Sequence, residues 1–84
     1  MRLGTVAGPV WMTLKHPAYE GRKLLVVRPE EGDGGEVLAV DLVDAGKGDR
    51  VLLLEEGSGA RQLLGDANAP IRSVIVGVVD GVQT

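Results

Sequence analysis

The side chains that could support catalysis are few and lie far apart in this sequence. His16 is the single histidine, and there is no cysteine. Pro17 biases His16 toward an extended backbone, and no nearby serine, cysteine or aspartate is arranged with it as a nucleophile pair. We therefore expect His16 to be an exposed loop residue.

Three carboxylates, those of Asp41, Asp44 and Asp80, could act as general acids or bases. No nucleophile, metal cluster or cofactor fingerprint accompanies them. The acidic, glycine-rich residues 30–36 are too short for the alternating oxygen ligands of a calcium loop, so they are predicted to form a hairpin loop. The sequence thus predicts no enzyme, no metal site and no cofactor.

Gly46, Lys47 and Gly48 bring a cation between two glycines, which suggests phosphate binding. A phosphate-binding loop, however, has a longer glycine-rich span and a Lys-Ser or Lys-Thr pair that opens a substantial helix. Residues 45–49 are therefore predicted to form a tight turn in which the glycines supply positive φ angles.

Charge and hydropathy restrict the partners. Twelve acidic and nine basic residues give a formal net charge of −3, whereas phosphate-backbone binding needs a concentrated basic surface. No apolar run approaches the roughly 20 residues that span a bilayer, and residues 1–5 lack the apolar centre of a secretory signal. We expect a cytoplasmic protein with no nucleic acid and no membrane as partner.

The length and composition favour one small β domain, residues 1–84. A chain of this size buries only about 60 to 65% of the surface that its unfolded form exposes. Its apolar residues are mainly Val and Leu, with no Phe, and this composition favours strands. The 13 glycines fall between apolar runs and are typical of turns.

Five strands and one short helix are predicted. A helical segment of one or two turns is expected within residues 57–65, between the last two strands, with Ser58 as N-cap and Gly65 as stop. The first strand should have a bulge or an edge at Gly8 and Pro9. The predicted strands are residues 2–13, 22–29, 37–43, 50–55 and 71–80.

Two of these strands are apolar at successive positions, in residues 24–27 and 74–79. Both of their faces must therefore be covered, and the chain is too short to cover every strand twice. A neighbouring subunit is the expected cover. The fold class is predicted to be all-β, a small five-stranded OB-like closed barrel, because closure removes exposed strand edges. An open sandwich is the alternative.

With these elements assigned, several short motifs stand out along the chain. They are Leu3-Gly4-x-Val6-x-Gly8, residues 23–27, Ala39-Val40-Asp41, residues 44–49, Val51-Leu52-Leu53, residues 57–62 and residues 76–80. Each motif is short, but together their order and spacing resemble the EutN/CcmL family, the vertex proteins of bacterial microcompartment shells, over nearly the whole chain. One departure is Ser58-Gly59, where the family commonly has two serines.

The resemblance implies a function that composition and spacing do not supply. Members form OB-like barrels, assemble as homopentamers, and occupy the fivefold corners of a shell whose facets are built of hexameric shell proteins. They are structural proteins of a compartment in the bacterial cytoplasm. The competing hypothesis is an OB-type module for nucleic acid or a small ligand, which needs aromatic side chains in a basic groove. Only Trp11 and Tyr19 are aromatic here.

Two candidate contact regions follow from the family match. Small residues allow close approach of two backbones and Arg61 offers several donors, so Gly57, Ser58, Gly59, Ala60 and Arg61 are the predicted subunit interface. Alternatively, Arg61 lies on a helix surface and Gly59 is a turn glycine. The turn with Gly46, Lys47 and Gly48 is the predicted shell-edge or pore region, or else a solvated loop.

Overall fold

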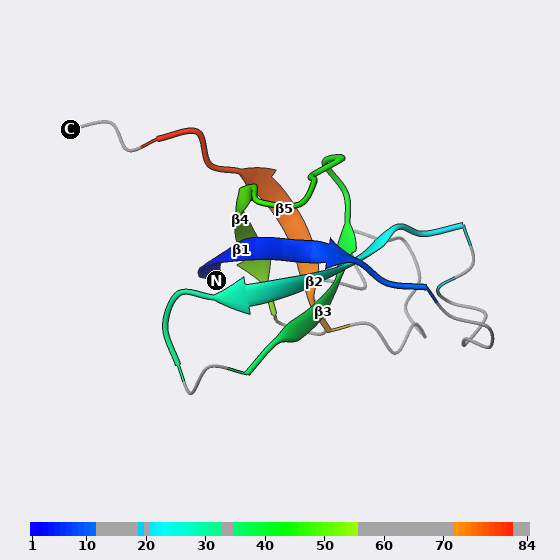
Figure 1. Ribbon diagram of the computed structural model, residues 1–84, viewed down its shortest axis with the longest axis horizontal. Coiled ribbons are helices and arrows are strands. Elements are labelled where there is room, and N and C mark those ends of the chain that lie inside the picture. The colour runs from blue at the N-terminus through cyan, green and yellow to red at the C-terminus, as the bar shows by residue number, and fades with distance from the viewer. Residues whose placement is uncertain (12–18, 20, 33–34, 56–71, 82–84) are drawn as a thin grey trace.

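The computed structural model describes residues 1–11, 19, 21–32, 35–55 and 72–81. These residues form a closed barrel in which the strands follow one another in the order β1-β2-β3-β5-β4 (Figure 1). The predicted five-stranded closed barrel is confirmed, and the open sandwich is wrong. The strands are β1 (Arg2–Pro9), β2 (Leu24–Pro29), β3 (Val37–Asp41), β4 (Arg50–Leu54) and β5 (Val74–Val78).

Most neighbouring strands pair antiparallel, while β3 and β5 pair parallel. A parallel pair cannot be joined by a tight turn, because the chain must cross from one end of the barrel to the other. Here β4, on the far side of β5, is part of that crossover. The β3–β5 pairing joins Val40 to Val74 and Asp41 to Ile75.

The strands are shorter than the sequence predicts. β2 begins at Leu24 and not at residue 22, β3 ends at Asp41 and not at 43, and β5 covers 74–78 and not 71–80. β4 ends at Leu54, one residue early. The apolar pattern continues past these ends because neighbouring loops also cover apolar side chains, so it overstates strand length.

The first strand confirms one prediction and corrects another. Its pairing with β2 shifts register between Val6 and Gly8, which is the irregularity expected near Gly8 and Pro9. The strand ends at Pro9 and does not continue to residue 13. The predicted helix in residues 57–65 and His16 lie outside the described residues.

The barrel interior is filled by small branched side chains. Alternate residues of each strand point inward, as the two-residue period of a strand requires. On β1, Gly4 is buried where a Cβ atom would lie 2.6 Å from Cγ1 of Val27. The interior cluster consists of Val6, Leu25, Val27, Ala39, Ala45, Val51, Leu53 and Ile75.

A second cluster lies on the outer face of the barrel and confirms that β2 is covered on both faces. Leu24, Val40 and Val74 are buried there and pack with Val10 and Tyr19, among others. The expectation that a neighbouring subunit supplies this cover is wrong for these three residues. The chain covers them itself. After β1 ends, Val10 stays beside the start of β2, where its N–H donates to the Leu24 carbonyl, 3.2 Å away.

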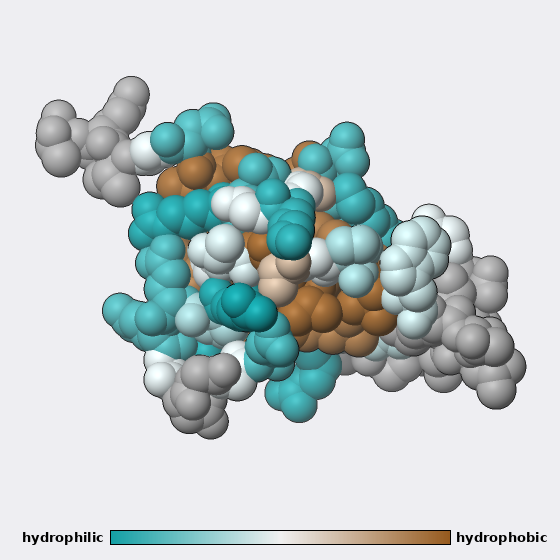
Figure 2. Space-filling view, viewed as in Figure 1, coloured by the Kyte–Doolittle hydropathy of each residue, from teal (hydrophilic) through white to brown (hydrophobic). Residues whose placement is uncertain are grey.

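Other apolar side chains remain uncovered by the chain itself. Figure 2 shows hydrophobic surface over β2 and β3, with hydrophilic residues along part of its border. On β3, Leu38 is exposed and pairs with Val26 of β2. Trp11, Leu42 and Val78 are also exposed.

Candidate assembly surface

The predicted shell-edge residues lie on residues 42–49, the segment that joins β3 to β4 and is called the 42–49 loop below. Gly46, Lys47 and Gly48 are all exposed, as a contact surface requires. The predicted subunit-interface residues Gly57, Ser58, Gly59, Ala60 and Arg61 lie outside the described residues. The described part of the candidate surface is therefore the 42–49 loop and what holds it in place.

Asp41, the last residue of β3, fixes the start of this loop. Its side chain is fully buried, and its two oxygens accept hydrogen bonds from the N–H groups of Val43 (3.0 Å) and Ala45 (2.8 Å). An aspartate that binds backbone groups a few residues later turns the chain at low cost. This contact explains why β3 ends at Asp41.

Lys23 holds the same loop from the neighbouring strand end. Its Nζ donates to Asp44 Oδ1 (3.0 Å) and to the Ala45 carbonyl (2.8 Å), and lies 3.3 Å from Asp41 Oδ2. The hydrogen bond to Asp44 raises the pKa of the Lys23 ammonium group, burial opposes this effect, and Asp41 adds to it. Lys23 therefore stabilises the fold up to alkaline pH and stops doing so once the pH rises through its raised pKa.

The turn itself has a fixed backbone. The Asp49 N–H donates to the Gly46 carbonyl (3.0 Å), while Asp49 Oδ2 accepts from the Gly46 N–H (2.8 Å). Gly48 has a φ of 89°, which confirms the predicted positive angle for this glycine. The expectation is wrong for Gly46, and the other positive angle belongs to Asp44, at 58°. Aspartate tolerates this region because its short side chain can hydrogen-bond locally.

Contacts with the barrel make the loop part of the rigid fold. The Val6 N–H donates to the Asp49 carbonyl and the Gly48 N–H to the Val6 carbonyl, each at 2.9 Å. Ala45 is buried in the interior cluster. The loop therefore presents Lys47 on a preformed support, and a partner that binds it need not order it first.

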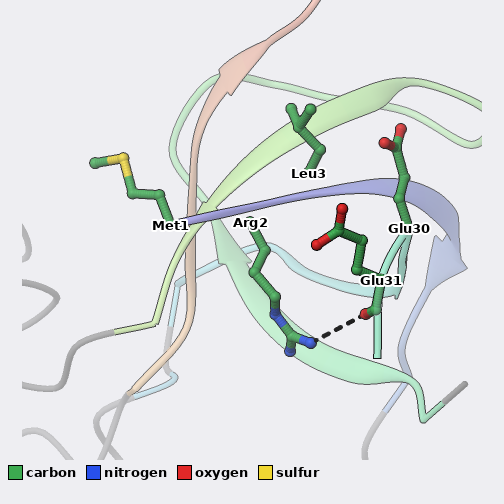
Figure 3. A pocket seen from close by; sticks show the side chains of 5 residues that line it. All are labelled: Met1, Arg2, Leu3, Glu30 and Glu31. Carbon is green, nitrogen blue, oxygen red and sulfur yellow. Dashed lines mark hydrogen bonds between the residues drawn. The ribbon is translucent and has the colours of Figure 1, made fainter. Parts of the chain in front are cut away.

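A second charged region lies where β1 begins and β2 ends. A depression of about 230 Å³ lies there. Figure 3 shows the side chains that line it, those of Met1, Arg2, Leu3, Glu30 and Glu31. The Arg2 guanidinium donates to the Glu31 carbonyl at 3.4 Å. The depression is partly open and is lined by both charged and apolar side chains, whereas a small-molecule site is usually more enclosed and more apolar.

Two of the charged residues around this depression, Arg2 and Glu30, form ion pairs. Arg2 binds the Glu55 carboxylate through two nitrogens, with Nη2 2.8 Å from Oε2. Hydrogen bonds from Arg2 hold the pKa of Glu55 below its ordinary value, although partial burial acts in the opposite direction. Arg50 likewise binds Glu30, and this contact lowers the pKa of the Glu30 carboxyl.

Within the described residues, the carboxylates do not gather into a catalytic or metal site. No group of three His, Cys, Asp or Glu residues there is placed to hold a metal ion. Asp41 and Asp44 share Lys23, and Asp80 is exposed beyond β5. The described part of the chain also contains no helix long and apolar enough to cross a membrane.

A fold of this kind hosts many functions, so comparison with known proteins decides the family. Residues 1–80 match the family described as "Ethanolamine utilisation protein EutN/carboxysome". The chain belongs to the EutN/CcmL family. The resemblance inferred from the motifs is confirmed.

Individual relatives match over nearly their full length. The chain is 42% identical to the microcompartment shell vertex protein PduN of Salmonella typhimurium, covering 95% of this chain and 96% of PduN. A solved structure of EutN superposes with a TM-score of 0.87 at 34% identity, covering 100% of this chain and 91% of EutN.

A third relative is named by its assembly as well as its role. The pentameric microcompartment shell protein GrpN from Rhodospirillum rubrum superposes with a TM-score of 0.82 at 40% identity. The match covers 100% of this chain and 99% of GrpN. The EutN/CcmL barrel is thus present in this chain.

The sequence does not predict the structural roles of three residues. Lys23, Asp41 and Gly4 are placed only in predicted strands and family motifs, with Asp41 also considered as a general acid or base. In the structure, Lys23 and Asp41 hold the 42–49 loop, and Gly4 packs against Val27 in the barrel. An aspartate at a strand end, followed by a small residue four positions later, is a signal for a side-chain-capped turn. Nothing local marks Lys23, because its partners Asp44 and Ala45 are distant in sequence.

Proposed function

We propose that this chain is a structural shell protein whose homopentamers cap the fivefold vertices of a bacterial microcompartment. Residues 1–84 act as one vertex domain, in a shell within the cytoplasm. The observation that carries the proposal is the match to GrpN, a pentameric shell protein that aligns with 100% of this chain. The named relatives PduN, GrpN, CcmL and EutN are all vertex proteins.

The shape of such a shell explains the role. A surface of hexagonal units is flat, and fivefold units introduce the curvature that closes it. A ring of five identical copies requires a heterologous interface, in which one surface of each subunit meets a different surface of the next. The outer edges of the ring then contact hexameric shell proteins, which are the proposed second partner.

Two regions are proposed for these contacts. Gly57, Ser58, Gly59, Ala60 and Arg61 form the contact within the ring, because small residues permit close approach and Arg61 can bind carbonyls or a carboxylate. Gly46, Lys47 and Gly48 face the shell edge or the ring axis. The rigid, exposed form of the 42–49 loop supports a contact role for the second region.

The alternative was an OB-type module that binds nucleic acid or a small ligand. The relatives reported above are shell vertex proteins, so they support the shell function over that alternative. The negative net charge of −3 points the same way.

The native mass of the purified chain tests the proposal. We expect a mass of five copies by native mass spectrometry, with the same result from sedimentation equilibrium at micromolar concentration. A stable monomer at that concentration would contradict the proposed ring. Co-production with a hexameric shell protein should then yield closed particles in electron micrographs, and open sheets or tubes should form when this chain is omitted.

A further inference from the structure

Trp11 is exposed to an extent that its own chain does not explain. It is the single tryptophan of the sequence, and 90% of its surface is accessible to solvent. An indole buries about 150 to 250 Å² when it is covered, so leaving it in water forgoes a large hydrophobic gain. Tryptophan is also among the residues most enriched in the hot spots of protein interfaces.

The residues just before Trp11 are held against the barrel. Val10 packs against the outer cluster, and its N–H binds the Leu24 carbonyl. Pro9 lies opposite Leu25 in the β1–β2 pairing. Trp11 thus follows a residue that is bound to Leu24, and Leu24 is the sequence neighbour of Lys23, which holds the 42–49 loop.

Trp11 therefore lies at the end of the barrel that carries the candidate assembly surface. The end of β1, the start of β2 and the end of β3 lie together there, and the 42–49 loop begins at the same place (Figure 1). Leu42, the first residue of that loop, is exposed as well. An apolar anchor and a rigid polar loop thus share one end of the molecule.

A second copy of this chain suits Trp11 better than a neighbouring shell hexamer does. In the proposed ring, a tryptophan left in water would favour aggregation whenever the ring exists free of the shell. The permanent interfaces of homo-oligomers are more apolar than contacts made later between separate particles. The most exposed aromatic side chain should therefore be covered when the ring forms.

We propose that Trp11 inserts into the neighbouring copy of this chain and anchors the contact between subunits. The proposal rests on the proposed function, because it assumes the ring. The receiving surface must be apolar and must offer an acceptor, because the indole N–H is a donor that needs a partner when buried. As the interface is heterologous, that surface is a different part of the neighbouring subunit.

Because Trp11 is the only tryptophan, its fluorescence in the unmodified protein reports this contact alone. In the ring, we expect emission shifted to shorter wavelength than that of N-acetyltryptophanamide, and acrylamide quenching reduced several-fold. Emission and quenching equal to those of the free indole compound, in a sample whose native mass is five copies, would overturn the proposal. That result would leave the proposed ring intact.

A variant tests whether the contact also contributes to affinity. For Trp11→Ala, we expect the concentration at which the ring half-dissociates to rise about thirtyfold or more, the loss typical of an interface hot spot. Trp11→Phe, which keeps an aromatic ring, should retain most of the affinity. The fold does not need this exposed side chain, so circular dichroism of Trp11→Ala should match the parent. Unchanged dissociation of a folded Trp11→Ala ring would overturn the anchoring role.

Discussion

Gly4 shows how one absent side chain sets the packing of the barrel. Added to its backbone, a Cβ atom would lie 2.6 Å from Val27 Cγ1 and 3.0 Å from the Arg28 carbonyl oxygen. The Arg28 backbone and the stiff, β-branched side chain of Val27 could move away from such a Cβ atom only at a considerable cost in free energy. The close approach of β1 to β2 at this point therefore requires glycine.

We predict that Gly4→Ala destabilises the fold by about 1 to 3 kcal/mol, the usual cost of overpacking a core. The measurement is the free energy of unfolding in urea. Gly77→Ala is the matched control within a strand, since a Cβ there meets no atom within 4 Å. Val27→Ala should partly rescue Gly4→Ala, so that the double variant is more stable than the sum of the two single effects predicts. Strict additivity would argue against the contact.

The Arg2–Glu55 pair makes stability depend on pH in a defined direction. Because Arg2 lowers the pKa of Glu55 from its ordinary value of 4.5, the pair stabilises the folded state above that value. The contribution disappears as the pH falls through the lowered pKa. We expect Glu55→Gln to melt below the parent at pH 7 and the two melting temperatures to converge in acid. A constant difference from pH 7 to pH 3 would show that the ion pair is not responsible.

For single residues, the sequence indicates which chemistry a side chain can support better than which contacts it makes in the fold. The absence of a catalytic set could be argued from His16 and the scattered carboxylates alone. The role of Lys23 could not, because it depends on a strand end meeting a loop twenty residues later in the chain. The requirement for glycine at position 4 depends in the same way on the distance to Val27.

The 42–49 loop is an element in its own right. Although it has no regular secondary structure along most of its length, its two ends and its middle are each fixed by hydrogen bonds or by burial. Its stability therefore depends on backbone geometry at specific positions. The glycines at 46 and 48 provide a direct comparison, because only the second has a positive φ.

We predict that Gly48→Ala costs about 1 to 2 kcal/mol, since an L residue is strained in the left-handed region. Gly46→Ala should stay within about 0.5 kcal/mol of the parent, as expected for an unstrained surface position. A Cβ at Gly46 would meet the Asp49 carboxylate at 3.9 Å, an ordinary contact. Chemical denaturation of both variants provides the measurement, and equal losses would mean that φ is not the cause.

The strands were predicted correctly in number and order, and less well in extent. Runs of apolar residues, mostly valine and leucine, locate β2, β3, β4 and β5, whereas β1 has no such run and is interrupted by glycine. Where each strand ends depends on contacts that the pattern does not encode. Asp41, for example, ends β3 by binding Val43 and Ala45.

At the scale of the whole molecule, substitutions in the two proposed contact regions should impair different stages of assembly. We predict that Lys47→Glu leaves the isolated ring at five copies and reduces the fraction of closed shells, because we propose the 42–49 loop as a contact with the shell and not with the next subunit. Arg61→Ala should instead move the native mass toward the monomer. Native mass spectrometry and electron microscopy of co-produced shells distinguish the two. Normal shells from Lys47→Glu would remove the loop from the shell contact, and an unchanged ring from Arg61→Ala would remove Arg61 from the interface.

Closure of the barrel could be predicted, because five strongly apolar strands in a short chain would otherwise leave two aggregation-prone edges. The sequence also predicts that both faces of two strands must be covered. The expected cover, a neighbouring subunit, is wrong for the outer cluster of Leu24, Val40 and Val74. Val10 and Tyr19 help to cover Leu24 from within the chain. A count of apolar residues cannot tell an internal cover from a neighbouring subunit, since both bury the same side chains.

The short parallel pairing of β3 with β5 has a consequence for how the barrel forms and opens. It joins only two residue pairs in register, whereas the β1–β4 pairing joins four. The two strands are also separated by more than thirty residues of chain, from Asp41 to Val74, so a large loop must close before they meet. This seam should be the last to form during folding and the first to exchange its amide protons with solvent in the native state.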